Sequence, residues 1–262
     1  FFFHPHAATP DPLWSRGLGD VYKRQSLLII VVASTVIGTV GFGFSLVAAP
    51  VLLLYLEPQQ VVVVANSLIA LLMIMVLSRT WKNLEFKASL GLVLGGMAAT
   101  PIGVLVLNSA SPGALRVTIA MVIIFLGLFS LKNVQLPFSR SKMAGPVFGF
   151  LTSLAVTTIA IGGPLGAIYA ISQRWKPDMI RAALALFFLS SDLVAFPLYV
   201  ATGLVEKDTL SNIGVLFPVL VIGFFLARLV VDLINERIFR YVVVAVIIVA
   251  GSATLIRELV KA

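Results

Sequence analysis

Two glycine-rich stretches have the residue types that bind an anion through backbone amides. Their small and polar residues are, in chain order, Gly41, Gly43, Ser45, Gly162 and Gly163. A helix that stops and restarts leaves several N–H groups without partners, and the restarting helix directs the positive end of its dipole toward the interruption. Glycine lets this backbone approach a ligand closely, and the Ser45 hydroxyl adds a donor. The two stretches are therefore predicted to form a substrate site for a small anion.

The hydrophobic runs that hold these stretches are too long to be single membrane helices. One run covers residues 26–56 and the other covers 143–173, whereas about 20 apolar residues span a bilayer. Glycine, serine and proline in the middle of a run predict that its helix is broken there. Broken helices at membrane depth occur where the loose backbone is buried in protein or lines a wet cavity, and in transporters they point to the binding site. The alternative is that the glycines only allow close helix packing.

The composition predicts a polytopic membrane protein. Of the 262 residues, 60% are hydrophobic and 11% are charged, whereas about a quarter of the residues of a soluble domain are charged. The net charge of +8 comes from basic residues scattered in short loops between apolar runs, as at the cytoplasmic ends of membrane spans. Nucleic acid is therefore not an expected partner, and membrane lipid is.

The residue types in the runs argue against an enzyme and against a metal or cofactor. The chain has no cysteine, and its two histidines are His4 and His6, so the hydrophobic runs contain neither a thiolate nor an imidazole ligand. The sequence contains no nucleophile–base constellation, and the Gly41-Phe-Gly43 string does not follow a soluble strand, as a nucleotide-binding loop would. We expect no catalytic residue, no cofactor and no metal ligand.

Eight hydrophobic runs divide the chain into two similar halves. The runs cover residues 26–56, 60–78, 88–107, 114–131, 143–173, 178–201, 209–231 and 238–256. When the halves are aligned, Gly43 falls on Gly162, and Arg116 in the fourth run falls on Arg240 in the eighth. Internal repeats of this kind are common in secondary transporters. The expected fold is an all-α polytopic membrane protein with two repeats of four runs, in which the first helix of each repeat is discontinuous or re-entrant.

The distribution of basic residues favours an inverted repeat. If the fifth run crosses the membrane once, the basic residues are divided almost evenly between the two sides. If this run folds back as a hairpin, most of them lie on one side, as the positive-inside rule requires of the cytoplasmic side. The hairpin would make the second half an inverted copy of the first.

The domain organisation follows from the repeats. The expected segments are an N-terminal segment 1–25, a first transmembrane repeat 26–131, a linker 132–142, a second transmembrane repeat 143–257 and a C-terminal tail 258–262. In the N-terminal segment the basic residues follow the apolar ones, which is the reverse of the order in a signal peptide. Its end, Gly19-Asp-Val-Tyr-Lys-Arg-Gln25, resembles translated sequencing-adapter sequence. This segment is therefore either non-native or disordered, or it is an ordinary cytoplasmic tail.

Four polar residues in the second and sixth runs are further candidates. Asn66 and Ser67 donate hydrogen bonds either to the anion or to a neighbouring helix. Arg181 either contacts the anion or extends to the membrane interface. Asp192 is the one acid well inside a hydrophobic run, and an intramembrane carboxylate is by default a functional hypothesis. It is predicted to couple transport to protons, and the alternative is a carboxyl that holds two helices together through a hydrogen bond.

Together these motifs resemble those of the TauE/SafE sulfite exporter family. The matching strings are Gly41-Phe-Gly43-Phe-Ser45 followed by Pro50 and Glu57-Pro58, Ile161-Gly-Gly-Pro164 followed by Lys176-Pro177, and Leu115-Arg116 with its counterpart Phe239-Arg240. The resemblance covers residues 26–257 and implies a small permease of the bacterial inner membrane, built from two repeats. It also implies a substrate among small anions such as sulfite, sulfoacetate and related organosulfur compounds. Phe42 and Phe44 depart from the glycine-richer form of the family, which implies a tighter or more apolar site.

The expected function is secondary transport of such an anion, with export as the direction that the resemblance implies and uptake as the alternative. The site is expected near the membrane midplane between the two broken helices, with alternating access to the two sides. The expected partners are the small anion, membrane lipid and a coupled proton, and no oligomeric state is predicted. Two alternatives stay open, namely an anion channel of the same fold and a membrane scaffold subunit that transports nothing.

Overall fold

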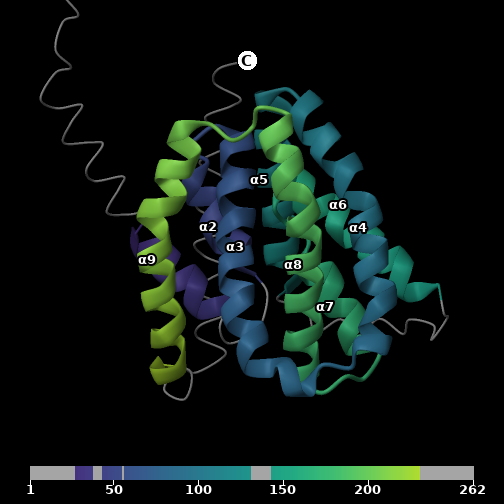
Figure 1. Cartoon of the computed structure of the whole chain (residues 1–262). Coiled ribbons are helices and arrows are strands. Elements are labelled where there is room, and N and C mark those ends of the chain that lie inside the picture. Colours follow the sequence, from purple (N-terminus) through teal and green to yellow (C-terminus); the bar gives the residue numbers. More distant parts are fainter. Residues whose placement is uncertain (1–26, 38–42, 55, 131–142, 231–262) are drawn as a thin grey trace, which may run out of the picture.

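Every regular element among the described residues is a helix. The computed structural model describes residues 27–37, 43–54, 56–130 and 143–230. The helices pack side by side as a bundle (Figure 1). The predicted linker 132–142, the eighth run at 238–256 and both terminal segments lie outside the described residues.

Four helices are long and apolar enough to span a membrane. They are α3 (Pro58–Thr80), which continues into the short helix η1 (Trp81–Asn83), α4 (Phe86–Ser109), α8 (Pro177–Ala201) and α9 (Lys207–Val230). Shorter helices accompany them, namely Leu27–Ile37, α2 (Phe44–Leu52), α5 (Pro112–Ser130), α6 (Ala144–Ile159) and α7 (Gly163–Ser172). The expectation of an all-helical, multi-pass membrane protein is confirmed within the described part of the chain.

Prolines mark the residues at which two spanning helices begin. Pro58 opens α3 and Pro177 opens α8, and the residues before them, Glu57 and Lys176, both have an extended backbone with φ −67°. Proline fits the first helical turn because its fixed φ suits the helix and its missing N–H would have no acceptor there. Proline also disfavours a helical conformation in the residue before it. The Glu57-Pro58 and Lys176-Pro177 pairs of the sequence therefore mark the starts of these two helices.

The closest helix pair joins the two halves of the chain. A Cβ added at Gly95 of α4 would lie 2.1 Å from the Pro146 carbonyl oxygen, and one added at Gly149 of α6 would lie 2.0 Å from the Leu92 carbonyl oxygen. The glycines therefore let the two backbones touch, which is how small residues drive helix association in membranes. A hydrogen bond of 2.9 Å between the Thr100 and Ser153 hydroxyls adds a polar contact across the same pair.

The fifth run folds as a helical hairpin. Its helices α6 and α7 are antiparallel, since Gly166 of α7 faces Thr152 in the middle of α6, and Tyr169 faces Gly145 at the start of α6. The turn between them contains Ala160 with a φ of 59°, and the Ala160 N–H donates to the Val156 carbonyl at 2.8 Å. Both outer ends of the hairpin therefore lie at one end of the bundle.

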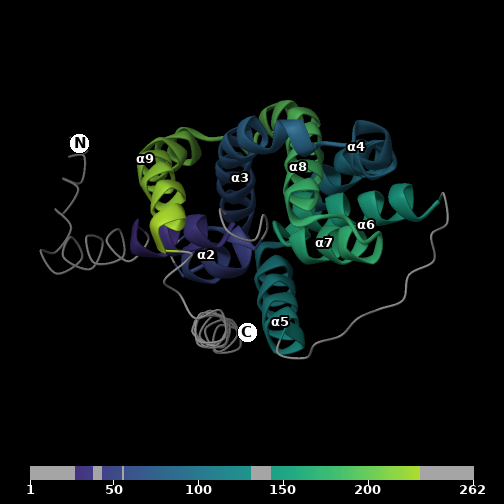
Figure 2. The ribbon, with the colours of Figure 1, turned by 90° about the horizontal axis from the view of Figure 1, so that it is seen from below.

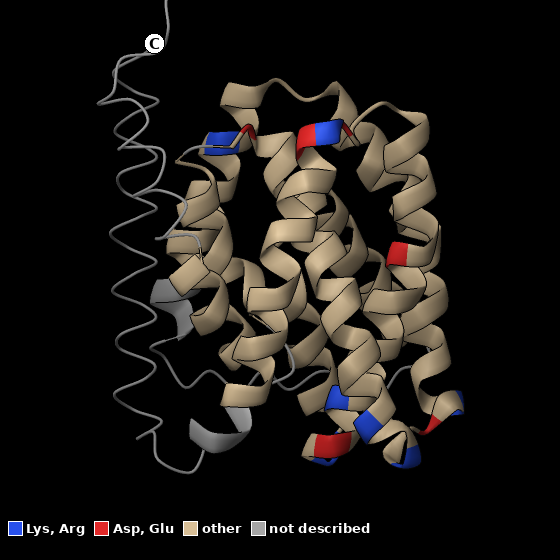
Figure 3. Ribbon diagram, turned by 60° about the vertical axis from the view of Figure 1, so that its left-hand side comes forward, with Lys and Arg blue, Asp and Glu red and all other residues tan. Residues whose placement is uncertain are grey.

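Basic residues from both halves of the chain lie at the end of the bundle where the α6–α7 hairpin begins and ends. The helices α3 and α8 are antiparallel, because Asn66 in the first half of α3 donates to Tyr199 near the end of α8 at 3.0 Å. The α3–α4 and α7–α8 connections consequently lie together (Figure 1). The basic residues in and beside these connections are Arg79, Lys82, Lys87, Arg174, Lys176 and Arg181. Charged residues gather at the two ends of the bundle (Figure 3). The inverted repeat as a whole stays a prediction.

The first run is divided into the helix Leu27–Ile37 and α2. Between them, residues 38–42, including Gly41, lie outside the described residues. The helix Leu27–Ile37 packs against α9, where the Thr35 hydroxyl donates to the Gly223 carbonyl at 3.2 Å. A view along the bundle places α2 on the same face as α5 and α7 (Figure 2).

We expect Gly149→Ala to destabilise the protein. The added methyl would meet the Leu92 carbonyl of α4, so the two helices must move apart, at a cost of about 1–3 kcal/mol. Gly214→Ala is the matched control, because an added Cβ in that part of α9 meets no described atom within 4 Å. The measurement is thermal unfolding in detergent followed by tryptophan fluorescence. Equal unfolding temperatures for the two variants would contradict the tight contact between α4 and α6.

Candidate functional site

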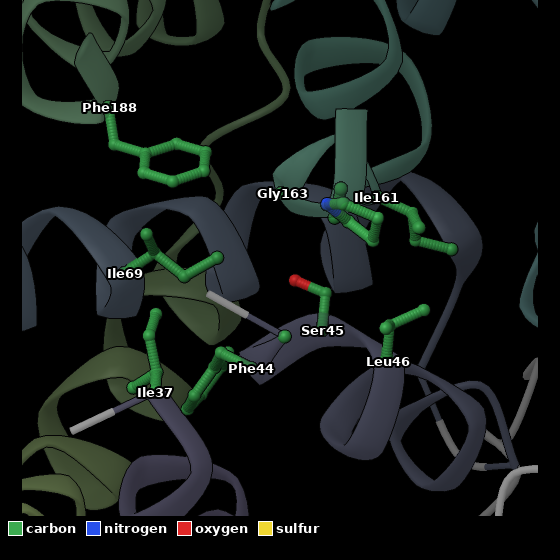
Figure 4. A pocket seen from close by; sticks show the side chains of 11 residues that line it. Ile37, Phe44, Ser45, Leu46, Ile69, Ile161, Gly163 and Phe188 are labelled. Carbon is green, nitrogen blue, oxygen red and sulfur yellow. The ribbon is translucent and has the colours of Figure 1, made fainter. Parts of the chain in front are cut away.

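The two interruptions meet at one cavity, which we call the central cavity. The first interruption contributes Gly43 and Ser45 at the start of α2, and the second contributes Ile161 and Gly163 before and at the start of α7. Figure 4 shows these segments facing each other, although they lie in different halves of the chain. The central cavity is therefore bordered by the N-terminal ends of two short helices.

The first of these helix starts depends on Gly43. This residue precedes α2 with φ 97° and ψ 3°, and no side chain caps the helix there. Such a positive φ is accessible to glycine and costly for other residues. The first N–H groups of α2 have no acceptor within the helix, and the residues that carry them line the central cavity.

The second helix start follows the turn of the hairpin. The helix α7 opens on Gly163-Pro164, again without a side-chain cap. The Leu165 N–H already donates to the Gly162 carbonyl at 2.9 Å, whereas the Gly163 N–H precedes every possible acceptor of its own helix. The helix dipole adds positive potential at the same point. Both halves thus present the kind of helix terminus that favours negative charge.

The Ser45 hydroxyl lies between these two helix starts. Ser45 is 4% exposed, and its Oγ is a buried atom without a hydrogen-bond partner among the described residues. Figure 4 shows the hydroxyl pointing into the central cavity, toward the side where Gly163 lies. Buried polar groups are almost always paired, so an unpaired hydroxyl here indicates a place where a ligand or water binds.

Apolar side chains close the rest of the central cavity. Ile69 of α3 and Phe188 of α8 cover it from the spanning helices, and Ile37 and Phe44 line it from the first run. Its volume is about 20 Å³, which leaves room for little more than a water molecule. The central cavity is therefore small in this structure. Phe44 fits the expectation of a tighter, more apolar site.

Gly162 is needed for close packing within the hairpin. A Cβ at this position would lie 2.3 Å from the Thr152 carbonyl oxygen and 2.4 Å from the Val156 Cγ2 atom. Any larger residue would therefore push α7 away from α6 and move the second helix start. This geometry supports the helix-packing interpretation for Gly162, whereas Gly163 borders the central cavity directly.

The Asn66 side chain forms hydrogen bonds that hold neighbouring helices together. Its side-chain amide donates to the Val156 carbonyl and to the Tyr199 hydroxyl, each at 3.0 Å. Tyr199 in turn donates to the Thr157 carbonyl at 3.3 Å. Both amide protons of Asn66 are used, so this side chain ties α3 and α8 to the last turns of α6. The sequence analysis did not identify Tyr199 as a candidate. The feature that could have identified it is its polar hydroxyl in an otherwise apolar helix, two turns after Asp192.

The remaining candidates do not border the central cavity. Ser67 and Asp192 line a different concavity between α3, α8 and α9. Arg181 lies at the basic end of the bundle, where its guanidinium pairs with Asp178 at 3.3 Å. The structure therefore brings together Gly43, Ser45 and Gly163.

Comparison with known proteins agrees with this architecture. The family model for sulfite exporter TauE/SafE matches residues 26–254. The chain belongs to the TauE/SafE family. Its members are membrane transporters, which confirms the resemblance predicted from the glycine and proline motifs. No curated protein and no solved structure matches the chain. In this TauE/SafE protein, the family match covers both interruptions and all the described helices.

We expect Gly43→Ala to impair anion transport, because the left-handed backbone before α2 becomes strained by about 1–2 kcal/mol and the first helical turn shifts. The added Cβ meets only Val36 Cγ1, at an ordinary 3.4 Å, so the effect comes from the backbone. Gly203→Ala is the matched control, since Gly203 has a φ of 77° and open space around it. Sulfite uptake into proteoliposomes and thermal unfolding are measured for both. A similar loss of transport in both variants would argue against a role for the α2 start.

Proposed function

We propose that this TauE/SafE protein is a secondary transporter for a small anion such as sulfite, sulfoacetate or a related organosulfur compound. The single observation that carries the proposal is the unpaired, buried Ser45 hydroxyl between two uncapped helix starts. Membership in the sulfite exporter family supports the substrate class. We propose export across a bacterial inner membrane as the physiological direction.

The anion would be held by backbone amides and one hydroxyl. The starts of α2 and α7 both line the central cavity, so the first N–H groups of α2 and the Gly163 N–H would bind the anion, and the two helix dipoles add to the attraction for negative charge. Apolar walls exclude water, which strengthens each of these interactions. No cation borders the central cavity among the described residues, so the anion can be released without breaking an ion pair.

The small size of the central cavity supports alternating access. An anion with three or four heavy atoms does not fit a space of about 20 Å³, so the walls would have to separate on one side to admit it. The helices α2 and α7 are short and lie against longer ones, and their movement would open the central cavity. The hairpin of α6 and α7 supports the proposed inverted repeat, in which the first run would enter and leave from the opposite side.

Flux through proteoliposomes tests the proposal and separates it from the alternatives. A transporter saturates with sulfite and exchanges labelled for unlabelled anion in counterflow, whereas a channel conducts without counterflow and a scaffold subunit does neither. Ser45→Ala should raise the KM for sulfite by about tenfold to a hundredfold, because a hydrogen bond to a charged group contributes about 1.5–3 kcal/mol.

Ser89→Ala is the control for Ser45→Ala. Ser89 is also a buried helical serine, but its hydroxyl donates to the Glu85 carbonyl at 3.1 Å on α4. The KM of this variant should match the wild type. If Ser45→Ala leaves the KM unchanged while sulfite still shows counterflow, the anion binds elsewhere and the assignment of Ser45 is wrong.

We further propose that Asp192 couples transport to protons. Asp192 is 7% exposed and lies two helical turns before Tyr199 on α8, on the same face of the helix. Tyr199 and Asn66 bond to the last turns of α6, and α6 leads directly into the second interruption. Gain or loss of a proton at Asp192 would thus act on the central cavity through this chain of contacts.

Asp192→Asn should abolish sulfite flux that is driven by an imposed pH gradient, because the amide cannot gain or lose a proton. Counterflow at equal pH on both sides should persist, since it needs no net proton movement. Asp208→Asn removes the same charge at the exposed start of α9 and should behave as wild type. A pH-driven flux that survives in Asp192→Asn would exclude the coupling role.

A further inference from the structure

A lateral groove opens between α3, α8 and α9, and no ligand described so far occupies it, although Asp192, with its proposed role in proton coupling, lies in its wall. Its walls are apolar, and the residues most exposed along it are Leu193, Ile74, Leu210 and Phe196. Its volume is about 470 Å³, within the range of sites that bind small molecules. The lateral groove shares no lining residue with the central cavity.

The lateral groove contains two polar groups that lack partners. The Oδ2 atom of Asp192 and the Oγ atom of Ser67 are buried without a hydrogen bond to any described residue, and both residues line the groove. Asp192 is sixteen residues into the 25-residue helix α8, so the carboxyl lies well inside the apolar part of the bundle. The groove thus combines the two features of a ligand-binding site, namely apolar walls and one buried acidic group without a partner.

No cation of the described helices lies at the depth of this carboxyl. The long helices around it are α3, α4 and α9, and the shorter helices α6 and α7, which also contact α8, carry no charged residue. The polar groups that share the groove are Ser67 of α3 and Tyr199 of α8 itself. The basic residues of these helices with described side chains are at or near helix ends, namely Arg79, Lys87, Arg181 and Lys207. A carboxylate in such surroundings is costly unless it takes up a proton or pairs with a cation.

We propose that the lateral groove binds amphipathic organic cations, with Asp192 as the counter-ion. The aromatic or alkyl part of the ligand would fill the groove and cover its apolar walls, which are then no longer exposed to lipid or water. The positive charge would pair with the carboxylate in a medium of low dielectric constant, where the attraction is strong. A negatively charged ligand would be repelled by the same group. This site is separate from the anion site and extends the protein's ligands to a class of opposite charge.

A lipid chain or a second copy of the protein would satisfy only the apolar walls. Neither supplies a positive charge at the depth of Asp192, so the carboxyl would keep a proton. The charge of the ligand is thus the property that distinguishes the proposed occupant. Because the cation pairs with the ionised form of Asp192, protons and the cation compete for this carboxylate. Cation binding is therefore expected to weaken as the pH falls.

The test is equilibrium binding of radiolabelled tetraphenylphosphonium, an apolar monovalent cation, to the full chain in a non-ionic detergent. We expect saturable binding to the wild type, and a dissociation constant at least about tenfold higher for Asp192→Asn, because removal of one partner of a buried charge pair is costly. Asp208→Asn loses the same formal charge at an exposed position and should bind as tightly as the wild type. Binding to the wild type should weaken at lower pH.

Two further variants keep the test decisive if Asp192→Asn does not fold. Ala70→Phe places a large side chain in the lateral groove and should block binding with the carboxyl intact, and Asp192→Glu should retain it. Equal binding by wild type, Asp192→Asn and Ala70→Phe would overturn the proposal, because the probe would then lie in detergent. Absence of saturable binding would also overturn it, and native mass spectrometry would identify a retained lipid or a second copy as the occupant.

Discussion

The fold depends on one constraint, which is that a backbone N–H group cannot be left facing lipid without a partner. The helices α2 and α7 begin inside the bundle without side-chain caps, so the first N–H groups of α2 and the Gly163 N–H of α7 have no partner in their own helices and lie away from water. Longer helices must therefore surround them, and α3 and α8 do so through Ile69 and Phe188. The position of the spanning helices follows from the need to enclose two helix starts.

The same enclosure creates the chemistry of the central cavity. Two positive helix termini and one hydroxyl face a space from which water is largely excluded, and low dielectric strengthens their effect on a charge. A buried hydroxyl without a partner costs about 1–3 kcal/mol. An anion that accepts a bond from Ser45 would recover this energy, so the protein without a ligand stores part of the free energy of binding.

The sequence predicted the local features well and the side-chain partners poorly. Gly43, Pro58 and Pro177 act on their own backbone, and the lengths of the apolar runs set the membrane class, so these features could be read without a structure. Asn66 and Asp192 depend on which helix lies beside them. The helix α3 is apolar on nearly all sides, and such a helix gives no periodic signal for the face that it turns toward a neighbour. The pairing of Asn66 with Tyr199, and the separation of Asp192 from the glycines, could not be predicted for that reason.

The backbone contact between α4 and α6 limits how the molecule can change shape. This contact joins the first half of the chain to the second, and at Gly95 and Gly149 the two backbones meet with no side chain between them that could repack. Close-packed surfaces of this kind move together or separate, and they do not deform gradually. A rocking of the two halves as independent rigid blocks would have to break this contact. The proposed opening would then come from movement of the short helices α2 and α7, with the α4–α6 pair fixed.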